Sequence, residues 1–220
     1  MTRPSPRLYL FTPPLADTAA FAPELAAALG AGDVAAVLLR LQGADERMLI
    51  NRAKAAAVAV QSRDVTLLLD GHPELAARAG ADGSHLTGIE ALTAAIGMLR
   101  PDRIAGAGGL RSRHDAMLAG ELGADYVMFG EPPPSSPPHA GDDRSGGHRP
   151  PFEAVLERAA WWAELFQPPC IGYAAGLDEV APLAQAGTDF VALGDWIWTH
   201  AQGPAAAVAA AAASLAERVP

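Results

Sequence analysis

The chain has 220 residues, of which 50% are hydrophobic and 19% are charged. This composition can bury one sizeable core, which excludes a disordered or fibrous chain. The formal net charge of -9 argues against nucleic acid and anionic membranes as partners, because both attract basic surfaces. Lys54 is the only lysine among 16 basic residues, so chemistry that needs a mobile ammonium group depends on that residue.

Cysteine usage and the apolar runs favour a cytoplasmic location. Cys170 is the single cysteine, so it cannot form an intramolecular disulfide or a thiolate metal site. Prolines interrupt the first residues where a signal peptide would be apolar. The small-apolar run at 205–213 is shorter than the roughly 18 to 20 residues that span a bilayer.

Short apolar runs alternate with alanine-rich stretches of helical spacing along the whole chain. The runs predict strands at Arg7–Phe11, Val34–Arg40, Val65–Asp70, Gly83–Leu86, Arg103–Ala107, Asp125–Phe129, Cys170–Tyr173 and Phe190–Leu193. The stretches predict helices at Ala19–Leu29, Asp45–Gln61, Pro73–Ala79, Ile89–Met98, Arg113–Leu122, Phe152–Phe166, Leu177–Ala186 and Pro204–Arg218. The alternation predicts a single α/β domain over residues 1–220 with the fold of a (β/α)8 TIM barrel.

A weak internal repeat precedes several of the predicted strands. It reads Gly-Asp at 32–33, Gly-Ala-Asp at 80–82 and 123–125, and Gly-Thr-Asp at 187–189. Glycine suits a left-handed helix terminus, and aspartate suits the turn into a strand. We therefore interpret the repeat as architectural.

The segment 131–151 interrupts this rhythm with seven prolines among polar and glycine residues. It predicts an irregular loop after the sixth strand, on the face where barrel active sites form. Two interpretations of this loop stay open: a lid over the active site, or an irregular surface segment. Arg144 and Arg149 lie in the loop, where a lid could reach the mouth of the barrel.

Residues at the carboxyl ends of the predicted strands are the candidates for chemistry, because barrel active sites lie there. They include Thr12, Arg40, Gln42, Asp70, His85, Glu90, Arg111, His114, Glu131, Gly194 and Asp195. Asp70 and Glu90 could hold Mg2+ together with an anionic ligand, although Asp70 could instead cap the following helix. Arg40 could clamp a phosphate or pair with a neighbouring acid. His85 could bind a ligand or be a hydrogen-bonded core residue.

Several blocks of sequence resemble the thiamine phosphate synthase and TenI superfamily. They lie at 8–10, 37–40, 67–70, 80–86, 123–130 and 186–192, and GADGSHL and GADYVMFG are the most specific. The resemblance implies a (β/α)8 barrel. Its synthases join hydroxymethylpyrimidine diphosphate to thiazole phosphate with Mg2+ and release pyrophosphate, whereas TenI-type members aromatise thiazole phosphate. The implied partners are small phosphorylated thiamine precursors or a related small molecule.

The resemblance also implies roles for individual residues. Asp70 and Glu90 would hold Mg2+, and Arg40 would contact the diphosphate. A tautomerase would need a proton-transfer group near Arg111 or His114. The implied substrate- and phosphate-binding positions are Arg40, His85, Ala175, Gly176, Gly194 and Asp195.

The chain departs from the family pattern where that pattern binds diphosphate. Leu38 and Gln42 stand in place of the family's glutamine and lysine, and Leu69 in place of its asparagine. No lysine follows 134–136, and Asp195 falls near the family's phosphate-binding serine. We therefore expect a synthase-like protein with weak or no coupling activity. The alternatives are a non-catalytic paralogue that binds a small molecule or a partner, and a TenI-type tautomerase. Assembly into a homo-oligomer stays open.

Overall fold

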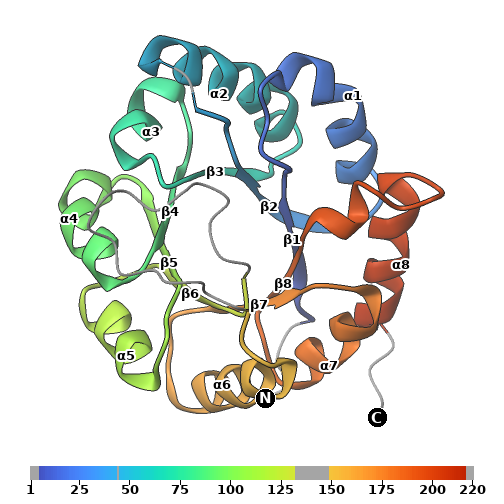
Figure 1. Cartoon of the computed structure of the whole chain (residues 1–220). Helices are drawn as coiled ribbons and strands as arrows, with labels where there is room; N and C mark the ends of the chain where they lie inside the picture. The colour runs from blue at the N-terminus through green and yellow to red at the C-terminus, as the bar shows by residue number, and fades with distance from the viewer. Residues whose placement is uncertain (1–4, 44, 132–148, 217–220) are drawn as a thin grey trace.

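The computed structural model describes residues 5–43, 45–131 and 149–216. Eight parallel strands close into a barrel in chain order, and helices surround it (Figure 1). The strands are β1 (Arg7–Phe11), β2 (Val34–Leu39), β3 (Thr66–Asp70), β4 (Gly83–Thr87), β5 (Ile104–Gly108), β6 (Tyr126–Phe129), β7 (Cys170–Ala174) and β8 (Phe190–Leu193). The predicted (β/α)8 fold is confirmed.

The α-helices are α1 (Thr18–Leu29), α2 (Glu46–Gln61), α3 (Pro73–Ala79), α4 (Ile89–Leu99), α5 (Arg113–Glu121), α6 (Phe152–Leu165), α7 (Val180–Gln185) and α8 (Pro204–Ala216). Two 3-10 turns, η1 (Leu177–Glu179) and η2 (Asp195–Ile197), precede α7 and α8. Within the described residues, no helix is long and apolar enough to cross a membrane. Most of the predicted loop at 131–151, including Arg144, lies outside the described residues.

One predicted helix divides in two. The stretch Leu177–Ala186 is a 3-10 turn over Leu177–Glu179 followed by the short helix α7. Pro182 accounts for the break, because it has no N–H for the carbonyl of Asp178 and its ring would clash with that group in a continuous helix.

Side chains alternate between two cores. On β1, Leu8 and Leu10 pack outward with the helices, whereas Tyr9 and Phe11 belong to a second cluster. We assign that second cluster to the barrel interior, because successive side chains of a strand point to opposite faces. Its members are Tyr9, Phe11, Ala36, Leu38, Leu68, Tyr126, Met128, Ile171, Tyr173 and Ala192. The barrel therefore has an unusually aromatic interior with three tyrosine hydroxyls.

The Gly-Asp repeat joins neighbouring strands at their starts. Side-chain oxygens of Asp82, Asp125 and Asp189 each accept a backbone N–H at the start of β3, β5 and β7, at 2.7, 2.8 and 2.8 Å. The glycine two positions earlier has a positive φ in all three cases. The fourth copy differs, because Asp33 pairs with the Arg7 side chain at 2.8 Å. The repeat is therefore architectural.

Candidate functional site

Arg40 and Asp195 meet at the mouth of the barrel. Arg40 directly follows β2, and its guanidinium donates to the Asp195 carboxylate and to the Thr12 carbonyl. Its backbone N–H donates to the Thr12 hydroxyl at 3.0 Å. The Arg40 side chain is 10% exposed and that of Asp195 is 60% exposed. Of the two interpretations open for Arg40, the structure contains the salt bridge, so its charge is balanced within the protein.

The turn after β7 uses its own carboxylate at a position expected to bind phosphate. The Ala175 N–H donates to Glu179 Oε2 at 2.7 Å. At Gly176, an added Cβ would clash with the Asp178 carboxylate, so a second acid lies against this turn. At Gly194, an added Cβ would overlap the Tyr173 hydroxyl. Acidic and phenolic oxygens therefore lie where an anion was expected.

Arg149 fixes the same turn from the other side. Its guanidinium binds both carboxylate oxygens of Glu179, at 2.8 and 2.6 Å. It also donates to the backbone carbonyls of Gly130 and Tyr173, each at 2.9 Å. These bonds tie the end of β6 to the end of β7. This second arginine near the mouth is thus also neutralised by a carboxylate of the chain.

Asp70 ends β3 and does not cap α3, because the N-cap residue there is His72. Burial raises the pKa of the Asp70 carboxyl, while Arg40 and His72 partly oppose this rise. Glu90 lies exposed in the first turn of α4. Among the described residues, no three or more His, Cys, Asp or Glu side chains gather as a metal site. The two carboxylates suit Mg2+ chemically, because this ion often binds one or two carboxylates and takes its other ligands from water and phosphate.

Arg111 and His114 are both exposed near the start of α5. The backbone N–H of Arg111 donates to Asp115 at 2.9 Å, next to the capping box that Asp115 forms with Ser112. The Arg111 carbonyl accepts a bond from Arg158 at 2.9 Å. The contacts of this segment serve the helix start, and they give His114 no partner for proton transfer among the described residues.

His85 is buried in the barrel and belongs to a chain of polar groups. Its Nδ1 lies 2.9 Å from the Tyr126 hydroxyl, which lies 3.1 Å from the Tyr9 hydroxyl. Burial lowers the pKa of His85 to about 4, so the ring is neutral at physiological pH. The other ring nitrogen, Nε2, has no hydrogen-bond partner among the described residues. A buried polar atom without a partner is rare in folded proteins and marks a position for a ligand or water.

Glu131 brings a carboxyl group to the same place. Its Oε1 accepts the backbone N–H of Gly109. Burial raises the pKa of Glu131 to about 7, and the nearby Asp70 adds to this effect. A Cβ on Gly108 would overlap both Glu131 Oε1 and His85 Nε2, so the two atoms flank one point. The sequence marked Glu131 as a strand-end acid, but it gave no sign that this residue meets His85.

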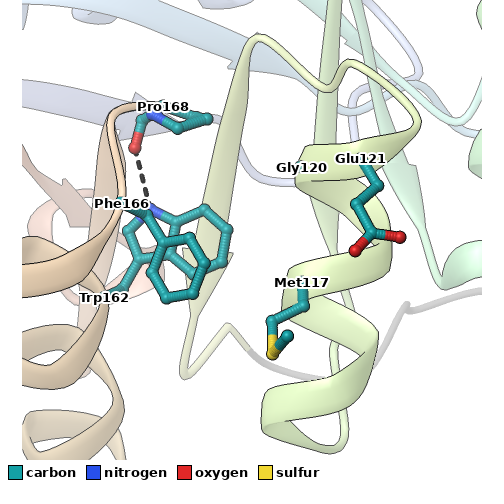
Figure 2. Close-up of a pocket in the computed structure, with 6 residues that line it drawn as sticks. All are labelled: Met117, Gly120, Glu121, Trp162, Phe166 and Pro168. Carbon is teal, nitrogen blue, oxygen red and sulfur yellow. Dashed lines mark hydrogen bonds between the residues drawn. The ribbon is translucent and has the colours of Figure 1, made fainter.

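A separate hollow of about 240 Å³ lies on the outer wall of the barrel. Figure 2 shows Met117, Gly120 and Glu121 of α5 on one side, and Trp162 and Phe166 on the other. Trp162 donates to the carbonyl of Pro168 at 2.8 Å and stacks on Phe166. Trp162 is therefore a packing residue on the outer side of the barrel, and this hollow lies away from the strand-end residues.

A family model and two sequence relatives point to the same family. The family model described as thiamine monophosphate synthase matches residues 8–197. A thiamine-phosphate synthase of Rhodospirillum centenum is 44% identical over 205 residues, which cover 92% of this chain and 94% of that protein. One of Hyphomonas neptunium is 39% identical over 215 residues, which cover 94% of this chain and 93% of that protein.

A solved structure supports the fold independently. Thiamine phosphate pyrophosphorylase from Pyrococcus furiosus superposes with a TM-score of 0.74 over 96% of each chain, at 22% sequence identity. Together with the match of the family model to most of the sequence, these relatives place the chain in the thiamine monophosphate synthase family.

Proposed function

We propose that this chain is a thiamine phosphate synthase-like protein with a degenerate phosphate site. It acts on thiamine precursors or a related small molecule, in the cytoplasm, and couples the pyrimidine diphosphate to thiazole phosphate weakly or not at all. The observation that carries this proposal is the ion pair between Arg40 and Asp195. In that pair, the cation expected to contact diphosphate is held by a carboxylate of the chain.

Electrostatics explain why this pair matters. Departure of pyrophosphate depends on cations that are already in place, and loss of one such partner costs on the order of 10² to 10³ in rate. Arg149 is paired with Glu179, and Lys54 lies on α2 in the outer ring of helices. Arg40 at the end of β2 and Arg149 against the end of β7 are therefore both paired with carboxylates of the chain.

Magnesium could restore part of this positive charge. We assign Asp70, with Glu90 as a second carboxylate, to hold Mg2+ when the diphosphate is present. The ion would supply positive charge to the leaving group. Asp70 would hold the ion from the end of β3, and the Asp70 carboxyl group would have to be ionised to do so.

The second candidate is a non-catalytic paralogue that binds a small molecule. The orphan Nε2 of His85 beside Glu131 favours it, because this pair offers ligand contacts that do not depend on phosphate. A TenI-type tautomerase receives less support, since Arg111 and His114 are exposed beside the cap of α5.

The test measures coupling and binding together. Purified protein is titrated with each phosphorylated substrate, with and without Mg2+, and thiamine phosphate formation is followed under the same conditions. We expect turnover at least 100-fold below that of a lysine-containing family synthase measured in parallel. Tight Mg2+-dependent binding of the diphosphate with comparable turnover would overturn the proposal.

A further inference from the structure

The exposed side of α5 is apolar at its centre and charged at its ends. Arg113, Met117 and Glu121 follow one another at intervals of four residues, so they lie along one side of the helix. All three are exposed. Two further apolar side chains are exposed nearby: Leu122 directly after α5 is 36% exposed, and Leu165 at the end of α6 is 63% exposed. This part of the outer wall therefore presents large apolar side chains to solvent.

The hollow between α5 and α6 lies directly beside this stripe. Met117 and Glu121 line it from α5, and the ring of Phe166 lines it from the other side (Figure 2). Gly120 lets the Trp162 ring approach α5, since a Cβ at Gly120 would lie 3.3 Å from that ring. The stripe thus borders an aromatic recess that contains one carboxylate in its lining.

The charges at the two ends of α5 oppose the dipole of the helix. Arg113 is the first residue of α5 and Glu121 is the last, whereas a helix dipole favours anions at the start and cations at the end. Glu121 forms no ion pair with any described residue. Arg113 donates through Nη2 to Glu157 at 2.8 Å, but its side chain is still 49% exposed. Its other N–H groups can therefore bind a second carboxylate.

An antiparallel copy of the same helix complements both charges. Positions 113 and 121 each lie four residues from 117. With a twofold axis at Met117, the basic start of one α5 faces the acidic end of the other, and the helix dipoles also oppose each other. The two Arg113–Glu121 pairs then lie about 12 Å apart along the helix, one on each side of the paired methionines. The stripe is thus complementary to itself.

We propose that two copies of this chain associate through α5, antiparallel about a twofold axis at Met117, with Arg113 of each copy bound to Glu121 of the other. The contact between the two methionines covers exposed apolar surface on both chains. The interface lies on the outer wall of the barrel, away from the strand ends, so this inference does not depend on the proposed function.

Sedimentation velocity of the full chain at neutral pH and low salt tests the association. We expect a dimer of about twice the chain mass of 22.7 kDa. Added salt should weaken the dimer, because exposed charge pairs are screened. Glu121→Arg places arginines opposite each other at both ends of the contact and should raise the dissociation constant about tenfold or more. Glu24→Arg, exposed on α1, makes the same change in charge and should leave the dissociation constant unchanged.

A charge swap tests the antiparallel arrangement. The double variant Arg113→Glu with Glu121→Arg restores two opposite-charge pairs only if the start of one helix faces the end of the other. It should therefore recover most of the affinity that Glu121→Arg loses.

Chemical cross-linking tests the position of the axis. Cys170, the single cysteine, is buried, so a cysteine introduced on the surface can be addressed selectively. A short bismaleimide should join two copies of Met117→Cys and should not join two copies of Glu24→Cys.

Four results would overturn the inference: a wild-type chain that is monomeric at the highest concentration tested, an assembly other than a dimer, a dimer that Glu121→Arg does not weaken, or a folded double variant that dissociates as readily as Glu121→Arg. Circular dichroism shows whether each variant is folded. None of these measurements depends on thiamine phosphate formation, so failure of this inference is distinguishable from failure of the proposed function.

Discussion

The raised pKa of Glu131 predicts that this residue makes stability depend on pH. Its pKa rises from 4.5 to about 7 on folding, so the folded state holds the proton more tightly than the unfolded chain. The resulting stability is present below about pH 4.5 and is lost as the pH rises to about 7. The difference corresponds to about 3 kcal/mol, since one pKa unit is about 1.4 kcal/mol.

Glu131→Gln removes the titratable carboxyl group and with it this dependence of stability on pH. Urea unfolding of wild type and variant at pH 5 and pH 8 should show the variant gaining about 2 to 3 kcal/mol relative to wild type at the higher pH. His85 acts in the opposite direction, because burial lowers its pKa to about 4, but it is present in both proteins. Glu164→Gln serves as the control for loss of one exposed charge. A difference that does not change with pH would refute the reasoning, because it would mean that Glu131 is ionised in the folded protein.

Two further predictions concern the barrel itself. Asp125→Ala leaves a backbone N–H at the start of β5 without its partner and should lower the free energy of unfolding by about 1 to 3 kcal/mol, whereas the exposed Asp102→Ala should leave it unchanged. Equal urea midpoints for the two variants would contradict the structural role of the repeat. Gly106→Ala places a Cβ into the ring of Tyr126 and should destabilise the barrel by about 1 to 3 kcal/mol, measured in the same way. A fully stable variant would show that the ring can move aside.

The order of strands and helices could be predicted because it depends on local patterns. Strand boundaries agree within one residue at each end, since apolar runs and the Gly-Asp turns mark them directly. One helix was predicted wrongly. The stretch 177–186 is a 3-10 turn followed by a short helix because of Pro182, whose effect on a helix depends on its position within the first turns.

The site was less predictable because its contacts join distant residues. Arg40 and Asp195 are 155 positions apart, and their pairing was only one of the options open for each residue. The meeting of Glu131 with His85 depends on the absence of a side chain at Gly108, which periodicity does not reveal.

The contacts of the tryptophans near the mouth were also not predictable from the sequence. Trp196 Nε1 donates to the carbonyl of Ala174 at 3.1 Å, and Trp198 Nε1 donates to that of Phe11 at 2.7 Å. Both residues therefore brace the ends of strands. These contacts join residues 22 and 187 positions apart, which the periodicity of the sequence does not reveal.

Asp195, a carboxylate of the chain itself, pairs with Arg40, the arginine expected to bind phosphate. The most direct measurement is the affinity for thiazole phosphate of wild type and Asp195→Ser, titrated at one pH and one salt concentration. Removal of the carboxylate frees Arg40 and ends the repulsion of the phosphate. We expect the variant to bind thiazole phosphate about tenfold more tightly, which corresponds to about 1.4 kcal/mol. Unchanged or weaker binding would contradict it.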